Sequence, residues 1–190
     1  METRREQIYT TAGALFSRRG YAATSVRDIA RELDLQGGSL YAHIKSKEDV
    51  LWAIVWGAAE RFFAAVRPLA ESDAPISDRL RGMIHAHIGV VAGQIERATV
   101  FLQDWKFLSP PRRDRIAALR GEYEGLYREV IAEGIAEGVF APTDPKLAAT
   151  LVLSALNGIP GWYRADGGLS PDDVAEGFAT MLLNGLKARP

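Results

Sequence analysis

Residues 24–51 read TSVRDIARELDLQGGSLYAHIKSKEDVL, and this stretch decides how the chain should fold. It has room for a capped helix, a three-residue turn, a second short helix and the start of a third. That order is the layout of a helix-turn-helix, a module that places one helix in the major groove of DNA. The stretch therefore predicts a DNA-binding head near the start of the chain.

Short-range signals mark the first helix of this stretch. Ser25 and Asp28 have the spacing of a capping box, so a helix should begin at Val26. Its apolar residues recur at helical spacing; they are Val26, Ile29, Ala30 and Leu33. Asp34 tolerates turn geometry and interrupts the pattern.

The second helix should place Leu40 and Ile44 on one buried face. Ser46 then looks like a new N-cap, because Glu48 and Asp49 put negative charge in the turn that follows.

Composition and charge restrict the class of protein and the kinds of site that the chain can form. The chain has 190 residues, of which 47% are hydrophobic and 25% charged, as in ordinary globular proteins. Its formal net charge is −1, so any basic surface for DNA must be local. The absence of cysteine excludes disulfides, thiolate catalysis and Cys-ligated zinc. No signal peptide or long apolar run is visible, so we expect a cytoplasmic protein with no membrane partner.

The chain as a whole reads as all-α, with about nine helices. Three later helix starts share a cap residue followed by proline; they are Ser109-Pro110, Asp144-Pro145 and Ser170-Pro171. A helix from Lys47 should end near Arg67, where it meets Pro68. We expect a helix-turn-helix head at residues 1–48 and a larger helical body at residues 49–190.

This sequence resembles the TetR family of transcriptional regulators. The matching residues include Leu15, Phe16, Gly20, Tyr21, Ala23, Thr24, Ser25, Val26, Arg27, Asp28, Ile29, Ala30, Gly38, Ser39, Leu40, Tyr41, Ser46, Lys47, Glu48 and Asp49. The chain departs from the family pattern where Asp34 replaces a glycine, Gln36 a serine, Gly37 a frequent lysine and Ile44 a phenylalanine. The first two departures leave the turn geometry open, and the third suggests an unusual operator sequence.

The resemblance implies a homodimer that binds double-stranded, palindromic operator DNA. The candidate DNA contacts are Thr24, Ser25, Arg27, Gln36, Gly37, Gly38, Ser39, Tyr41, His43 and Lys47. The family places Tyr41 against a phosphate, although it can also be a packing aromatic. Lys47 lies at a helix N-terminus, where backbone N–H groups favour a phosphate. The ordinary alternative for His43 and Lys47 is solvent-exposed helix surface.

In this family the last two helices form the dimer, which here implies residues 144–158 and 170–187. Reading two DNA half-sites about 34–36 Å apart requires two recognition helices, which favours a dimer. The alternative for residues 144–158 is an intramolecular core helix, because their apolar side chains cover a broad part of the helix surface.

The helical body carries candidate effector-binding residues among its aromatic positions, most of which we assign to the core. The candidates are Phe63, His87, Phe101, Trp105, Leu108, Tyr123, Tyr127, Asn157 and Trp162. Residues 101–116 and 155–178 resemble regulators of fatty-acid, sterol or aromatic-acid catabolism, which implies an acyl-CoA thioester as effector. Its phosphates would lie near Arg97, Arg112, Arg113 or Arg120; for Arg112 and Arg113 the alternative is a solvated first helical turn.

The function we expect is that of a ligand-responsive repressor. Effector binding would move the sixth helix, tilt the fourth and release the operator. Two alternatives are a repressor of an efflux pump with a hydrophobic drug-like ligand, and a helical ligand-binding protein without a DNA role. We expect no enzyme, cofactor or metal, because His85 and His87 lack the spacing of an HExxH pair and no phosphate-binding loop is present.

Overall fold

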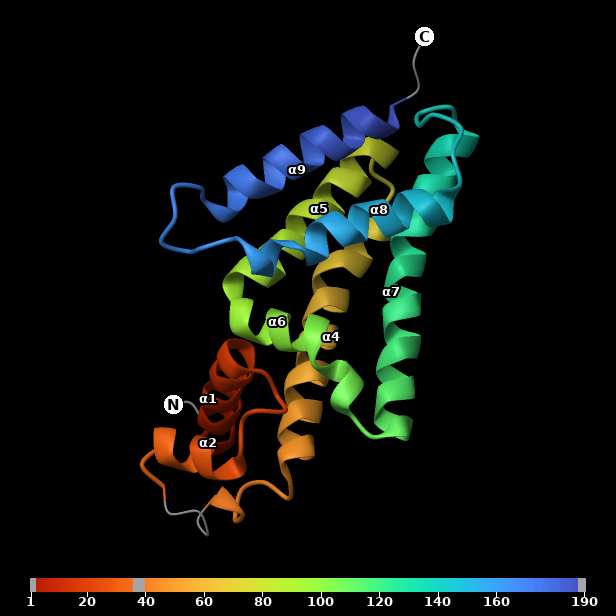
Figure 1. The fold of residues 1–190 in the computed structure, drawn as a ribbon. Helices are drawn as coiled ribbons and strands as arrows, with labels where there is room; N and C mark the ends of the chain where they lie inside the picture. The colour runs from red at the N-terminus through yellow and green to blue at the C-terminus, as the bar shows by residue number, and fades with distance from the viewer. Residues whose placement is uncertain (1–2, 36–39, 188–190) are drawn as a thin grey trace. The chain divides into compact units, whose positions relative to one another are not determined.

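The computed structural model describes residues 3–35 and 40–187. Over these ranges the chain forms α-helices, two short 3-10 helices and no strand, which confirms the all-α class (Figure 1). The α-helices are α1 (Arg4–Arg19), α2 (Val26–Glu32), α4 (Lys47–Ala70), α5 (Ile76–Gly93), α6 (Ile95–Gln103), α7 (Pro110–Ala136), α8 (Pro145–Asn157) and α9 (Pro171–Leu186). The 3-10 helices are η1 (Trp105–Phe107) and η2 (Ile159–Gly161). None of the described helices is long and apolar enough to span a membrane.

Three of the predicted helix starts are confirmed by capping contacts. Ser25 and Ser170 each form a capping box, with Asp28 and Asp173 as the third helical residue. Asp144 accepts a hydrogen bond of 2.9 Å from the backbone N–H of Leu147 at the start of α8. These side chains satisfy N–H groups that lack a partner within their own helices.

The predicted end of α4 is wrong. Pro68 lies inside the helix, which continues to Ala70. Proline removes only its own N–H, and the backbone N–H of Glu71 still bonds the Arg67 carbonyl at 3.0 Å. The helix therefore ends one turn after the position where proline was expected to stop it.

The chain divides into two compact units. The first comprises residues 1–60 and 94–118, and the second comprises residues 61–93 and 119–190. In the first, α1 packs against α2 and α6; in the second, α5 packs against α8 and α9 (Figure 1). Both α4 and α7 contribute residues to each unit. The boundary expected at residue 48 concerns function and stays a prediction.

Two helices, one in each unit, end with the same hydrogen-bond motif. After α7, Gly138 has a φ of +74°, and the N–H of Val139 bonds the Gly134 carbonyl at 2.8 Å. After α2, Asp34 has a φ of +53°, and the N–H of Leu35 bonds the Ala30 carbonyl at 2.9 Å. Both are Schellman motifs, which place one residue in the left-handed region. Asp34 therefore adopts the conformation that glycine usually supplies.

Gly134 in α7 makes room for a neighbouring ring. A Cβ atom at this position would lie 2.3 Å from Cδ2 of Phe140 and 3.0 Å from Cγ2 of Ile76. Phe140 is fully buried, so its ring has little space to move away. The missing side chain at Gly134 is thus part of the packing of the second unit.

Candidate functional sites

The helix-turn-helix stretch is partly described by the structure. Leu40 and Ile44 are both buried, which confirms the predicted apolar face. Ser46 caps α4, because its Oγ accepts a 3.0 Å hydrogen bond from the N–H of Asp49. Four candidate DNA contacts lie outside the described residues; they are Gln36, Gly37, Gly38 and Ser39.

Three candidate DNA-contact residues donate hydrogen bonds to other groups of the protein instead. Two of them do so through side-chain hydroxyls. Thr24 is buried, and its hydroxyl donates to the Gly20 carbonyl at 3.0 Å. The Ser25 hydroxyl donates to Oδ2 of Asp28 at 2.5 Å. A phosphate oxygen needs a donor, so contact with either hydroxyl would require its present bond to open. Their predicted DNA roles stay predictions, and their observed contacts stabilise the start of α2.

Lys47 is the third of these candidates. Its Nζ donates to the carbonyls of Tyr21 and Thr24 at 2.9 and 2.8 Å, and lies 4.0 Å from the centre of the Tyr21 ring. Burial lowers the pKa of this ammonium group, while the charge of Asp104 opposes the change. Two of its three N–H donors hold the loop before α2, so only one is available to a phosphate.

The other described candidates face solvent to different extents. Arg27 and Tyr41 are exposed, with 58% of Tyr41 accessible, whereas His43 is half-buried. A guanidinium group and an accessible phenol suit phosphate or base-edge contacts. Arg27 and Tyr41 are therefore the described candidates best placed to reach DNA.

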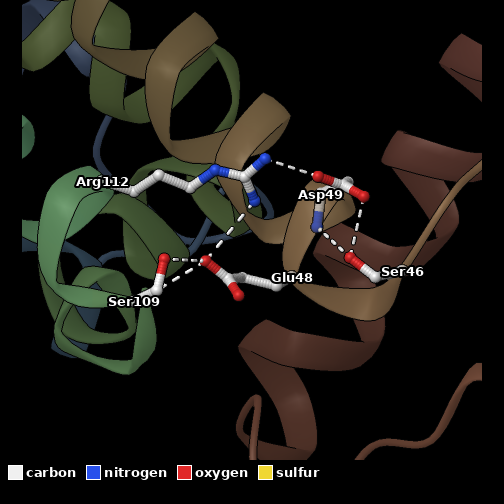
Figure 2. Close-up of polar contacts among 5 residues, drawn as sticks. All are labelled: Ser46, Glu48, Asp49, Ser109 and Arg112. Atoms are coloured by element: carbon white, nitrogen blue, oxygen red, sulfur yellow. Dashed lines mark hydrogen bonds and ion pairs between the residues drawn. The ribbon is translucent and has the colours of Figure 1, made fainter.

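A charged network joins the first turns of α4 and α7 within the first unit (Figure 2). Arg112 donates from Nη2 to Oδ1 of Asp49 at 2.5 Å, and its Nη1 lies 3.4 Å from Oε1 of Glu48. That same Glu48 oxygen accepts from the Ser109 hydroxyl at 2.7 Å and from its backbone N–H at 3.1 Å. Two carboxylates of α4 are thus held by a cation and a hydroxyl at the start of α7.

These contacts shift the ionisation of the network toward the charged forms. Hydrogen bonds from Ser109, and then the charge of Arg112, lower the pKa of Glu48. Hydrogen bonds from Arg112 and Ser46 lower the pKa of Asp49. The sequence did not predict this network, because Ser109 was interpreted only as a helix cap and its partner lies 61 residues earlier.

In the second unit, four predicted effector residues form a group centred on a buried histidine. His87 on α5 is 1% exposed, and its Nδ1 lies 3.0 Å from the Tyr123 hydroxyl on α7. The Tyr127 hydroxyl donates to the Met83 carbonyl at 3.1 Å. Phe63 packs edge-on against Tyr123 at a ring-centre distance of 5.4 Å. Phe62, which was not among the sequence candidates, also belongs to this group, because its ring centre lies 4.8 Å from that of His87.

Burial controls the chemistry of this aromatic cluster, which comprises Phe62, Phe63, His87, Tyr123 and Tyr127. It lowers the pKa of His87 to about 3, so the imidazole is neutral near neutral pH. Nε2 of His87 is buried and has no hydrogen-bond partner among the described residues. A buried polar atom without a partner is a candidate point of attachment for a ligand.

The remaining five effector candidates belong to other elements of the chain. Phe101 and Leu108 are buried in the first unit, where Trp105 is half-buried. Trp162 stacks on Phe178 at a ring-centre distance of 6.1 Å, and Asn157 ends α8.

The candidate phosphate-binding arginines have varied surroundings. Arg97 contacts Glu6 and Thr10 at 3.1 and 3.0 Å. Arg112 is held by Glu48 and Asp49, and Arg113 lies 3.6 Å from Asp114. Arg120 is half-buried, and burial lowers its pKa. The contacts of Arg97 and Arg112 favour structural roles over phosphate binding.

Large apolar side chains remain exposed on α8 and α9. Leu147 and Leu151 are 65% and 60% exposed, one helical turn apart on α8, and Met181 of α9 is 65% exposed. The opposite side of α8 packs in the core through Ala148, Ala149, Val152 and Leu156. Exposed apolar patches of this kind indicate a surface for another protein.

Comparison with known proteins agrees with the arrangement of a helix-turn-helix head and a larger helical body. Residues 8–54 match the family of bacterial regulatory proteins named tetR, and residues 73–186 match the tetracyclin repressor-like C-terminal domain. The chain therefore belongs to the TetR family of transcriptional regulators.

Three relatives illustrate this similarity. The transcriptional repressor KstR2 of Mycobacterium tuberculosis is 29% identical over 98% of this chain and 94% of its own length. The structure of that ketosteroid regulator matches with a TM-score of 0.94 at 28% identity, over 100% of this chain and 97% of the other. PfmR of Thermus thermophilus matches with a TM-score of 0.86 at 35% identity, over 95% and 99% of the two chains. AibR, in complex with isovaleryl coenzyme A and operator DNA, matches with a TM-score of 0.86 at 28% identity, over 95% and 98%.

Proposed function

We propose that this TetR family member is a repressor that is released from operator DNA by an apolar effector, most simply an acyl-CoA thioester. The observation that carries the proposal is the aromatic cluster around His87, which combines an apolar lining with one buried polar atom that has no partner among the described residues. AibR, whose structure holds isovaleryl coenzyme A, and the ketosteroid regulator KstR2 support an effector of this kind.

On the DNA side, we assign phosphate or base contacts first to Arg27 and Tyr41. Thr24, Ser25 and Lys47 position the helix-turn-helix through the contacts described above. Substituting Arg27 with alanine should weaken operator binding without loss of folding, because this side chain is exposed.

The dimer is assigned to the exposed faces of α8 and α9. Leu147, Leu151 and Met181 provide apolar area that the single chain leaves uncovered. A dimer also supplies the second recognition helix that a palindromic operator needs. Charged substitutions at Leu151 should therefore weaken both dimerisation and operator binding.

Coupling between effector and DNA runs through α4 and α7. These helices are joined at their first turns by Arg112, and they also carry Phe62, Phe63, Tyr123 and Tyr127 of the aromatic cluster. A ligand that repacks this cluster therefore acts on both helices. It favours release only by binding the DNA-free state more tightly, so operator DNA must weaken effector binding by the same factor.

The test measures operator binding by fluorescence anisotropy at fixed salt, with DNA from upstream of the gene. Acyl-CoAs of increasing chain length should release the DNA, while matched free acids and a hydrophobic drug-like compound should not. Release by the drug-like compound alone would favour an efflux-pump regulator. Failure to bind any palindrome upstream would favour a ligand-binding protein without a DNA role.

A further inference from the structure

The first unit contains a cavity of about 240 Å³ that the proposed function does not use. Three segments form its walls: the first two turns of α1, the turn that precedes α4, and the first two turns of α4. We call it the head cavity, and its lining includes Arg5, Tyr9, Lys45, Asp49 and Trp52. A molecule bound here would therefore touch the helix-turn-helix region directly.

The size of the head cavity limits what it can hold. Its volume of about 240 Å³ equals the share of about eight water molecules in the liquid. Sites for drug-sized ligands measure about 300–1,000 Å³, so an acyl-CoA is too large for this space. Because ligands pack against protein as densely as organic molecules pack in crystals, the cavity has room for one aromatic ring with a small substituent.

The charges of the lining favour an anion. The carboxylate of Asp49 is already engaged, because Arg112 donates to Oδ1 at 2.5 Å and the Ser46 hydroxyl donates to Oδ2 at 2.8 Å (Figure 2). Its negative charge is therefore balanced by a cation of α7. Arg5 and Lys45 are exposed cations that line the cavity from two different segments. A bound carboxylate would lie beside two positive charges and one neutralised carboxylate.

The rings of the lining favour a flat, aromatic ligand. Trp52 is half-buried, with its ring centre 5.1 Å from that of Trp56 and 5.5 Å from the guanidinium carbon of Arg112. These neighbours hold the indole in place before any ligand arrives, so little entropy is lost on binding. Tyr9 adds a second half-buried ring from α1. Aromatic groups pack on such rings in offset or edge-on geometry.

We propose that the head cavity binds a small aromatic carboxylate. Arg5 and Lys45 hold the carboxylate, since a guanidinium group can donate to both of its oxygens, and Trp52 and Tyr9 contact the ring. This is a second small-molecule site, distinct from the aromatic cluster around His87. It goes beyond the proposed acyl-CoA response and does not depend on it.

The class of ligand is tested by ¹⁹F NMR titration of the full-length protein with 4-fluorobenzoate. 4-Fluorobenzamide has the same shape without the charge and should bind at least about tenfold more weakly. Trifluoroacetate is an anion without a ring and should also bind more weakly than 4-fluorobenzoate. Absence of 4-fluorobenzoate binding, or equal binding of the benzamide, would overturn the proposal.

A matched pair of variants separates the cavity from general charge attraction. Arg4 and Arg5 are adjacent, exposed cations of α1, but Arg4 bonds Gln7 at 2.8 Å and is absent from the lining. Arg5→Gln and Lys45→Gln should each weaken 4-fluorobenzoate binding about three- to fivefold. Arg4→Gln should leave it unchanged, and an equal loss from Arg4→Gln and Arg5→Gln would overturn the site.

The place of binding can be observed without changing the lining. The chain has four tryptophans, so ¹⁵N-tryptophan labelling gives four indole N–H signals, which single Trp→Phe variants assign. 4-Fluorobenzoate should shift the signal of Trp52 and leave that of Trp162, in the second unit, in place. If only Trp162 shifts, or if His87→Phe abolishes binding and Trp52→Leu does not, the acid binds in the second unit and the proposal is wrong. Operator release by acyl-CoA is measured separately, so either proposal can fail while the other stands.

Discussion

The charged network of the first unit and the aromatic cluster of the second are stabilised by different chemistry. In the first, Arg112, Glu48 and Asp49 keep about a third of each side chain in contact with solvent. In the second, Phe62, His87 and Tyr127 are enclosed and uncharged. Partly exposed ion pairs can open at small cost, whereas enclosed rings cannot be altered without leaving a cavity or an unpaired polar atom. The charged network is therefore the easier of the two to rearrange, and the aromatic cluster is the more sensitive to what fills it.

The largest effect is expected from a cavity in the second unit. Phe62→Ala should lower the free energy of unfolding by about 3–5 kcal/mol, because a fully buried ring is removed. Phe107→Ala in the first unit is the control, since half of that ring is exposed, and it should cost under about 1 kcal/mol. Urea denaturation followed by circular dichroism measures both; equal costs would contradict the enclosed packing of Phe62.

Acidification should affect the second unit before the first. Burial lowers the pKa of His87 from 6.5 to about 3, so between these pH values the unfolded chain binds a proton that the folded chain does not. Stability therefore falls as pH decreases below 6.5, by about 2 kcal/mol at pH 5. His87→Gln should flatten this pH dependence, whatever its effect on stability at pH 7. An unchanged slope in the variant would refute the neutral, buried state of His87.

The charged network of the first unit responds at lower pH and more weakly. The pKa values of Glu48 and Asp49 are lowered from 4.5 and 3.8, so their stabilisation is present above these values and is lost as pH falls through the folded pKa values. Arg112→Met should cost about 1 kcal/mol at pH 7 and reduce the acid-induced loss below pH 4.5. Arg113→Met is the control, because Arg113 lies near Asp114, its neighbour in the same helix. This substitution should change the free energy of unfolding little. A larger loss from Arg113→Met would argue against the network.

The smallest effect compares the two Schellman motifs directly. Asp34→Gly should raise stability by roughly 0.5–1 kcal/mol, because glycine adopts a φ of +53° without strain. Gly138→Asp should lower stability by a similar amount, since it places a residue with a side chain at a φ of +74°. Thermal melting of the two variants should therefore shift in opposite directions. Shifts in the same direction would show that the Asp34 side chain contributes more than its backbone strain costs.

Local signals made most of the fold predictable. The capping boxes at Ser25 and Ser170 and the Asp144-Pro145 start act over three or four residues, so sequence spacing reveals them. The end of α4 was misjudged because proline removes one hydrogen bond but does not unwind the turn around it. Asp34 was expected to leave the turn uncertain, and it instead adopts the left-handed conformation itself.

The candidate sites were less predictable, because they depend on contacts between distant segments. Residue types at helical spacing identified His87, Tyr123 and Tyr127 as candidates, but only the fold reveals which nitrogen of His87 lacks a partner among the described residues. Lys47 was predicted to contact phosphate from its place at a helix start. Its bonds to Tyr21 and Thr24, more than twenty residues earlier, follow from tertiary packing and have no short-range signature.

The space beside Gly134 has a consequence for the sequences of homologous proteins. Because the Phe140 ring occupies the volume that a Cβ at position 134 would need, these two positions cannot vary independently. In an alignment of relatives, alanine at the position of Gly134 should be accompanied by a smaller residue at the position of Phe140. Natural variation at this pair should therefore appear as covariation between two positions six residues apart, even where neither touches DNA or effector.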